Sequence, residues 1–158
     1  FEPAMATATP EATPAATSCG LPEGGDAEVE KLVEAWWATG WNADDATGFD
    51  EITDDGLIHH WASGPDTVGD EASMERVATW RAAMPDMKIA HEEILVDGNL
   101  AAARWTFTGT DTGGVMGAAP TGKAVSVQGI NVFGICDGEI AEVWSEMDMA
   151  GMMAQLGG

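Results

Sequence analysis

Basic residues are scarce in this chain, which has 6 Lys and Arg against 27 Asp and Glu and a formal net charge of −21 at pH 7. Nucleic-acid binding needs clustered cations that neutralise phosphates, whereas the basic residues here are scattered between Lys31 and Lys123. We therefore expect no nucleic-acid partner. Apolar runs are also short, and none approaches the roughly 18 residues that suggest a bilayer-spanning helix, so no membrane-spanning segment is predicted.

Several catalytic motifs are missing as well. The chain has no Tyr, which excludes an oxyanion hole built on a tyrosine hydroxyl, and it has no Gly-x-Ser-x-Gly elbow, Walker loop or dinucleotide fingerprint. Its histidines lack metal-ligand spacing: His59 and His60 are adjacent on a predicted strand and face opposite sides, and His91 stands beside Glu92 and Glu93. We therefore expect neither a metal nor a cofactor.

Cysteine is equally rare, since Cys19 and Cys136 are the two in the chain. The first lies in residues 1–25, which are rich in Ala, Thr, Pro, Glu and Gly and are predicted to form an extended tether. Such a stalk, and a first residue that is not Met, favour a protein that is secreted or tethered to the cell surface. A disordered tail on a cytoplasmic protein is the alternative. The cysteines can form a disulfide or stay free thiols.

Residues 26–158 have the composition of one folded domain. Apolar residues make up 45% of the chain, which includes 7 Trp, 4 Phe and 9 Met, enough to enclose one core. They recur at helical spacing from Asp26 to about Gly40 and from Asp70 to Pro85, and a weaker helix is predicted over residues 44–52.

The second half of the domain alternates with the period of a β-strand. A short strand is predicted over residues 57–61, and two long hairpins over 88–110 and 123–148 turn at Asp97-Gly98 and Asp137-Gly138. A C-terminal helix is predicted over residues 149–156. Helices first and antiparallel hairpins afterwards indicate an α+β domain, with helices on one face of a curved sheet.

Six short motifs stand in order along most of this domain. They are WNADD (41–45) with LIHH (57–60), MPDM (84–87), ARWTFTGT (103–110), PTGK (120–123), DGEIAEVW (137–144) and QLG (155–157). Together they resemble the SnoaL-like polyketide cyclase (ester cyclase) family of the nuclear transport factor two-like superfamily. The resemblance implies a cone-shaped α+β barrel, in which helices pack on a strongly curved, mostly antiparallel sheet that encloses one pocket.

For function, the resemblance implies cofactor-free acid/base chemistry on a small apolar or aromatic carbonyl ligand. A carbon next to a carbonyl would lose a proton, and the enolate would close a ring by intramolecular aldol attack. The superfamily fold also serves other reactions and plain binding. A secreted, non-catalytic small-molecule-binding module, or a hydrolase, dehydratase or isomerase, is therefore the alternative. A second copy of the chain, in a homodimer, is a further candidate partner.

The resemblance assigns the catalytic roles to Asp148 and His60. Asp148 matches the family's general acid/base, and His60 matches its strand-end histidine, which would polarise a substrate carbonyl or exchange a proton with Asp148. The residues alone leave plainer roles open. Asp148 suits the N-cap of the helix that begins at Met149, and His60 suits a hydrogen-bonded position in a wall.

Ligand contacts are expected from tryptophans and a few polar residues. Seven Trp in one small domain suggest an aromatic-walled cavity for a flat ligand, although core packing is the ordinary role of Trp. The expected lining residues are Trp36 or Trp37, Trp105, Trp144, Gln128, Asn131 and Glu146. By the resemblance Trp144 points into the pocket beside Asp148, and strand alternation lets at most one of Gln128 and Asn131 reach it.

Overall fold

The computed structural model describes residues 19–44 and 48–157. Most of the predicted tether (1–18), part of the predicted helix over 44–52 (45–47) and residue 158 lie outside the described residues. The elements, in chain order, are α1 (Asp26–Ala35), the π-helix η2 (Trp36–Trp41), β1 (Thr53–Trp61), β2 (Thr67–Val68), α2 (Asp70–Ala83), β3 (Lys88–Asp97), β4 (Leu100–Thr110), the 3-10 turn η3 (Val115–Gly117), β5 (Ala124–Cys136), β6 (Glu139–Met147) and α3 (Met149–Leu156). No helix in this described part is long and apolar enough to cross a membrane.

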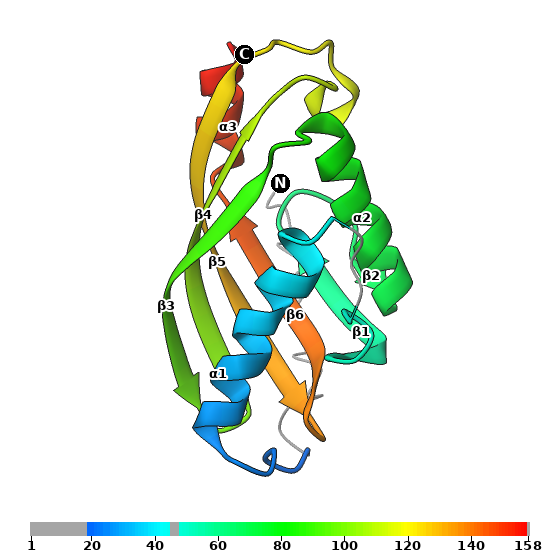
Figure 1. The fold of residues 1–158 in the computed structure, drawn as a ribbon, viewed down its shortest axis with the longest axis vertical. Coiled ribbons are helices and arrows are strands. Elements are labelled where there is room, and N and C mark those ends of the chain that lie inside the picture. The colour runs from blue at the N-terminus through cyan, green and yellow to red at the C-terminus, as the bar shows by residue number, and fades with distance from the viewer. Residues whose placement is uncertain (1–18, 45–47, 158) are drawn as a thin grey trace, which may run out of the picture.

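The six strands form one sheet in the order β2-β1-β6-β5-β4-β3. β1 pairs in parallel with β6, and the other neighbours are antiparallel. The sheet is curled and not closed into a barrel (Figure 1). α1 and α2 lie across its concave side, and α3 packs near the start of β5. The predicted α+β class, with helices packed on a curved sheet, is confirmed.

Both predicted hairpins form, and their turns carry the residues that left-handed backbone requires. The β5–β6 hairpin turns at Asp137-Gly138, where φ is 51° and 92°, as in the two-residue turns that favour Asp-Gly. The β3–β4 hairpin turns at Gly98-Asn99, because Asp97 still pairs with Leu100. This turn lies one residue later than predicted.

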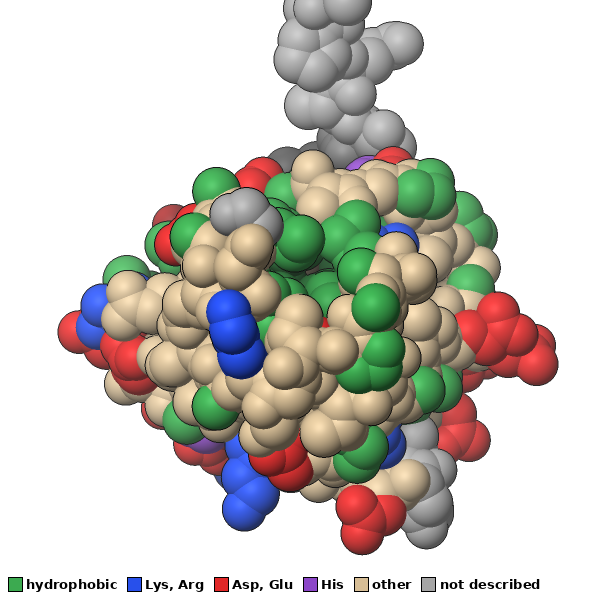
Figure 2. Space-filling model, turned by 90° about the horizontal axis from the view of Figure 1, so that it is seen from above, with side chains coloured by type: hydrophobic (Ala, Val, Ile, Leu, Met, Phe, Trp, Pro, Cys, Tyr) green, Lys and Arg blue, Asp and Glu red, His purple; other side chains and the backbone are tan. Residues whose placement is uncertain are grey.

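The core lies between the inner face of the sheet and the helices. Strand alternation is regular in β4 and β5: Ala103, Trp105 and Phe107 are buried on one side, and their neighbours along the strand are more exposed. α1 covers this face with Val29 and Val33, which are fully buried. Viewed from the α3 end, the molecule shows a hollow with hydrophobic side chains on its floor and acidic side chains around its outline (Figure 2).

Two predicted elements differ from the structure near residue 50. Of the predicted helix over 44–52, the described residues from Gly48 on form a turn, and β1 starts at Thr53, earlier than predicted. The segment is too poor in apolar residues to bury a helical face, although Phe49 is buried against Trp36. The first predicted helix does reach its expected end, but its last turn is a π-helix, in which Asn42 N–H donates to the Trp37 carbonyl at 2.8 Å.

The two cysteines are joined. Cys19 and Cys136 form a disulfide across a sequence separation of 117 residues. The bond fastens the segment that leads into α1 to the last residue of β5, at the end of the molecule that carries the β5–β6 turn (Figure 1).

Candidate functional site

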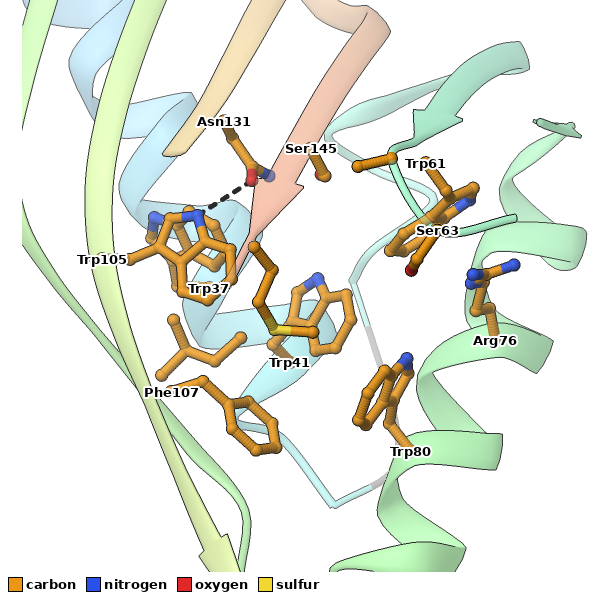
Figure 3. Close-up of a pocket in the computed structure, with 13 residues that line it drawn as sticks. Trp37, Trp41, Trp61, Ser63, Arg76, Trp80, Trp105, Phe107, Asn131 and Ser145 are labelled. Carbon is orange, nitrogen blue, oxygen red and sulfur yellow. Dashed lines mark hydrogen bonds between the residues drawn. The ribbon is translucent and has the colours of Figure 1, made fainter. Parts of the chain in front are cut away.

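The inner face of the sheet bears a pocket with mainly aromatic walls (Figure 3). The aromatic residues are Trp37 and Trp41 from η2, Trp61 from β1, Trp80 from α2, and Trp105 and Phe107 from β4. We call this cavity the tryptophan pocket. Its volume is only about 40 Å³, room for no more than a few water molecules, because the side chains nearly fill it.

A wider groove adjoins the tryptophan pocket and shares Ser63, Arg76 and Trp80 with it. The groove lies between α2 and the η3 segment and has a volume of about 420 Å³. Pockets that bind small molecules typically measure about 300 to 1,000 Å³. The groove therefore supplies the room for a ligand, and the tryptophan pocket supplies an apolar, aromatic end.

Local geometry explains how separate elements supply these walls. Trp37 and Trp41 lie four residues apart in η2, and Arg76 and Trp80 lie four apart in α2, so each pair shares one side of its helix. On the strands, residues two apart share a face, which brings Trp105 and Phe107 of β4 to the same wall.

Trp105 is positioned by a glycine on the neighbouring strand. Its pairing partner is Gly129 of β5, where an added Cβ would come within 2.2 Å of the indole. The Trp105 ring can therefore lie against the β5 backbone. Its Nε1–H donates to Oδ1 of the buried Asn131 at 2.9 Å. Both residues line the tryptophan pocket, and both remain predicted ligand contacts.

A second polar pair joins a lining residue, Ser145, to His59, which is buried and is not itself a lining residue. The Nε2 atom of His59 is 2.7 Å from Oγ of Ser145, a pocket residue of β6. The His59 ring also stacks on Trp61, with 3.5 Å between ring centroids. Burial, followed by the positive charge of Arg76 and the neighbouring His60, lowers the pKa of His59 to about 3. Its imidazole is therefore neutral at physiological pH.

Several buried nitrogens have no hydrogen-bond partner among the described residues. They are Nε1 of Trp36, Trp37 and Trp41, and Nδ1 of His59. An unpaired buried polar group costs about 1–3 kcal/mol. Trp37 and Trp41 line the tryptophan pocket, and Figure 3 shows the Trp41 nitrogen turned toward its middle. A ligand with a carbonyl or other acceptor would satisfy the Nε1–H donors of Trp37 and Trp41.

The predicted catalytic carboxylate lies elsewhere. Asp148 is exposed and caps α3, where its Oδ1 accepts from Gly151 N–H at 2.7 Å. Together with Gln128 and Glu146 it borders a shallow hollow on the outer face of the sheet. Asp148 is absent from the walls of the tryptophan pocket, so its expected position there is wrong and the N-cap alternative describes its geometry.

His60 and Trp144 also face outward. Trp144 is 36% exposed and stacks on His60, with ring centroids 5.2 Å apart. His60 places Nε2 at 2.8 Å from the buried Glu142 and Nδ1 at 2.9 Å from Asp66. Burial lowers the pKa of His60, but the hydrogen bonds and charges of these carboxylates outweigh burial and raise it. The expected pocket positions of His60 and Trp144 are wrong.

Of the remaining predicted ligand contacts, some face the pocket and others face away from it, depending on the strand face or helix side on which they lie. Asn131 faces the pocket, whereas Gln128 is exposed on the opposite face of β5, in line with the prediction that at most one reaches the cavity. Glu146 lies on the outer face of β6 and is wrongly placed by the prediction. Of the tryptophan pair in η2, Trp37 lines the pocket and Trp36 packs in the core against Phe49.

Sequence reasoning missed Trp41, Trp61, Trp80, Arg76, His59 and Ser145 as candidate site residues. For two of them the signal was present. Leu57, His59 and Trp61 alternate along β1, and the apolar residues on both sides of His59 indicate that its face is buried. In β6, Ser145 lies between Val143 and Met147, on the face free of carboxylates.

No metal centre is found in the residues that the structure describes, where no group of three or more His, Cys, Asp or Glu side chains could hold an ion. The tryptophan pocket itself is lined by no Asp or Glu in that part of the chain. Its chemistry rests on neutral His59, Ser145, Asn131, indole N–H groups and the cation of Arg76.

Comparison with known proteins identifies relatives. The family model of the SnoaL-like polyketide cyclases matches residues 31–156. No curated protein matches the sequence. TsrD from Streptomyces laurentii is similar in structure, with 30% sequence identity and a TM-score of 0.74 over 84% of this chain and 96% of that one.

Two further solved structures share the fold. A proposed SnoaL-like polyketide cyclase from Jannaschia sp. CCS1 superposes with a TM-score of 0.77 at 22% identity, over 82% of this chain and 92% of that one. IdmH from Streptomyces antibioticus, a proposed polyketide cyclase, gives a TM-score of 0.70 at 25% identity, over 82% and 99%.

Proposed function

The chain belongs to the SnoaL-like polyketide cyclase family, and we propose that, like other members, it binds a small molecule. The proposed ligand is a flat, largely apolar carbonyl compound held at the tryptophan pocket and groove. The proposed reaction closes a ring in this compound by cofactor-free, aldol-type chemistry. The observation that carries this proposal is the 2.7 Å hydrogen bond between Ser145, which lines the mainly aromatic pocket, and the buried His59. Aromatic walls with a few convergent polar groups are typical of small-molecule sites.

The pair His59–Ser145 offers a route for the proton. When neutral His59 accepts the Ser145 hydroxyl proton at Nε2, the Ser145 oxygen can take a proton from the carbon next to the substrate carbonyl. The enolate attacks the second carbonyl, and the resulting alkoxide recovers the proton through Ser145, so that proton transfer balances. Aromatic walls that fold the substrate supply the proximity that intramolecular attack needs.

The low basicity of His59 restricts the substrate. With a pKa of about 3, protonating His59 at pH 7 costs roughly 5 kcal/mol, at about 1.36 kcal/mol per pKa unit. That cost adds to the barrier of every proton abstraction. The proposal therefore favours substrates whose C–H is already acidic because it lies between two carbonyl groups.

A second candidate is a non-catalytic small-molecule-binding module. The specific observation in its favour is that no carboxylate lines the tryptophan pocket in the described residues, so a stronger base than His59 is lacking there. Both candidates would bind the ligand at the same aromatic walls. They differ in that only the enzyme would remove a proton from the bound ligand.

Deuterium exchange of an aromatic β-keto ester tests the proposal. Ethyl 2-naphthoylacetate in D₂O near pD 6 would be followed by NMR at the carbon between its carbonyls, and its binding by calorimetry. We expect the native protein to bind it and to accelerate exchange, and Ser145→Ala and His59→Gln to lose the acceleration while binding changes less than about threefold. His91→Gln on exposed β3 is the matched control. Binding without acceleration would favour the binding module, and no binding would refute both.

We also propose that the protein acts outside the cytoplasm, secreted or held at the cell surface. The Cys19–Cys136 bond supports this, since disulfides persist in oxidising compartments and are rare in the cytosol. Thiol titration under denaturing conditions, on protein isolated from its host, should find no free thiol. Two titratable thiols would contradict the proposal.

The homodimer is likewise a proposal. It draws support from apolar side chains on the outer face of the sheet, where Leu95 is 71% and Ile130 49% exposed. Sedimentation velocity at micromolar concentration should show a dimer, and Ile130→Glu should dissociate it. A monomer throughout that range would contradict it.

A further inference from the structure

Arg76 differs from Arg81 and Arg104 because it has no acidic partner among the described residues. Arg104 forms an ion pair with Glu92 at 2.8 Å, and Arg81 lies 3.9 Å from Asp44. Among the residues that the structure describes, no carboxylate oxygen lies within 4 Å of the Arg76 guanidinium. This is unexpected in a chain with 27 acidic residues and 6 basic ones.

The position of Arg76 makes the missing partner significant. Its side chain lines both the tryptophan pocket and the groove, so it lies at the junction of the two. Figure 3 shows Arg76 on α2, beside Trp61 and Trp80 of the pocket. The guanidinium carbon lies 4.4 Å from the ring centroid of Trp61, so an indole face supplies part of the stabilisation that a carboxylate would give. On another side the guanidinium packs on the backbone at Gly64, where an added Cβ would meet Nη2 at 2.8 Å.

This packing removes water from a charged group. Burial lowers the pKa of Arg76, which expresses the cost of keeping the cation there. A half-buried cation without a counter-charge is unfavourable in the empty site, and an anion of the right shape would relieve that cost on binding.

We infer that the flat ligand of the proposed function carries a carboxylate, and that Arg76 binds this carboxylate at the junction of groove and tryptophan pocket. The inference rests on the proposed function, since it names a group on the same ligand. The planar guanidinium can donate two parallel hydrogen bonds to a carboxylate, whereas a single cation would leave half the charge of a dianion such as phosphate uncompensated.

The surrounding charges permit an anion at this point. Glu75 is the one carboxylate among the described residues that line the groove, and its side chain is in an exposed position. In the view of Figure 2 the acidic side chains lie around the outline of the molecule, and salt at physiological strength screens charges beyond about 8 Å. A ligand held at Arg76 would lay its ring along Trp80 and point its other end toward Ser145.

Binding at Arg76 would also act on the proton acceptor. The Arg76 charge is one of the causes of the low pKa of His59, second to burial. A carboxylate beside Arg76 offsets that charge and makes His59 more basic. The acidic ligand would thus strengthen the base that the proposed chemistry uses, which a neutral ligand of the same shape cannot do.

Two planar probes of nearly equal shape test the inference: 2-naphthoate, an anion, and 2-acetylnaphthalene, its neutral methyl ketone. Their dissociation constants would be measured by calorimetry at 0.1 M salt on the native protein, Arg76→Gln, Arg76→Lys and Arg104→Gln. Arg104→Gln removes the same charge from the same residue type on the outer face, so it controls for the net charge. Thermal unfolding verifies that each variant is folded.

We expect the native protein to bind 2-naphthoate at least tenfold more tightly than the ketone. Arg76→Gln should weaken binding of the acid at least tenfold and of the ketone less than threefold. Arg76→Lys should keep part of the preference for the acid over the ketone, and Arg104→Gln should keep all of it. Equal affinity of the native protein for both probes, or a preference that survives in Arg76→Gln, would overturn the inference and leave the proposed function standing. Failure of both probes to bind the native protein would overturn the proposed function as well.

Discussion

Replacing His59 by Gln should make the protein less sensitive to acid. The pKa of His59 is lowered from 6.5 to about 3, first by burial and then by the charges of Arg76 and His60. Between these two pH values, His59 is protonated in the unfolded chain and neutral in the folded protein. Free energy of unfolding rises with pH wherever the unfolded state binds more protons. The contribution of neutral His59 is therefore complete above pH 6.5 and is lost progressively as the pH falls toward 3.

The size of the effect follows from these two values. Between pH 8 and pH 5, His59 should remove about 2 kcal/mol from the free energy of unfolding. The pKa of His60 is raised, so its stabilisation is present below pH 6.5 and is lost as the pH rises through its folded-state value. His60 remains in the variant, so the difference between the two proteins isolates His59.

Guanidinium unfolding followed by tryptophan fluorescence, at intervals between pH 8 and pH 5, measures this difference. His59→Gln keeps a group that can hydrogen-bond Ser145 and should be less stable than the native protein at pH 8 by about 1–2 kcal/mol, with the gap closing by pH 5. His91→Gln, on the exposed side of β3, should follow the native curve. A constant gap for His59→Gln across this range would refute the assignment of a buried, neutral histidine.

Three further results are expected. Gly129→Ala should lower the free energy of unfolding by about 1–3 kcal/mol in denaturant titrations, because the new Cβ would meet the Trp105 indole at 2.2 Å and the Glu146 carbonyl at 2.5 Å; unchanged stability would contradict this packing. Trp105→Ala should weaken binding of 2-acetylnaphthalene at least tenfold by calorimetry, whereas Trp144→Ala on the outer face should change it less than twofold; the reverse order would move the site to the outer face. The melting temperature should rise with NaCl to about 0.5 M, since salt screens repulsion within a chain of net charge −21, and a falling temperature would show that favourable ion pairs dominate.

The fold was predictable because its signals are local and repeated. Alternation in β4 and β5 and the Asp137-Gly138 turn specify the long hairpins, and amphipathic spacing specifies α1 and α2. The π-helical turn of η2 was not predictable, since no propensity scale separates it from ordinary helix. Of the two adjacent tryptophans at its start, Trp37 reaches the pocket and Trp36 packs in the core.

The site was predicted less well, for a reason visible in β6. The resemblance pointed Trp144 and Asp148 inward, which would also have turned Glu146 toward the core at a high desolvation cost. The structure buries Val143 and turns the small and apolar side chains of Ser145 and Met147 to the pocket. Strand parity combined with the cost of burying charge gives the correct face. The direction of Arg76 depends on tertiary packing against Trp61, for which the sequence holds no local signal.

The disulfide also sets how the domain would be presented on a surface. If the chain were held through residues before Cys19, as proposed above, the force would enter the sheet at the end of β5, beside the β5–β6 turn, and would bypass α1. The η3 wall of the groove lies toward the opposite end of the molecule (Figure 1). A domain fixed in this way would stand with that wall toward the medium, open to molecules that diffuse in from outside.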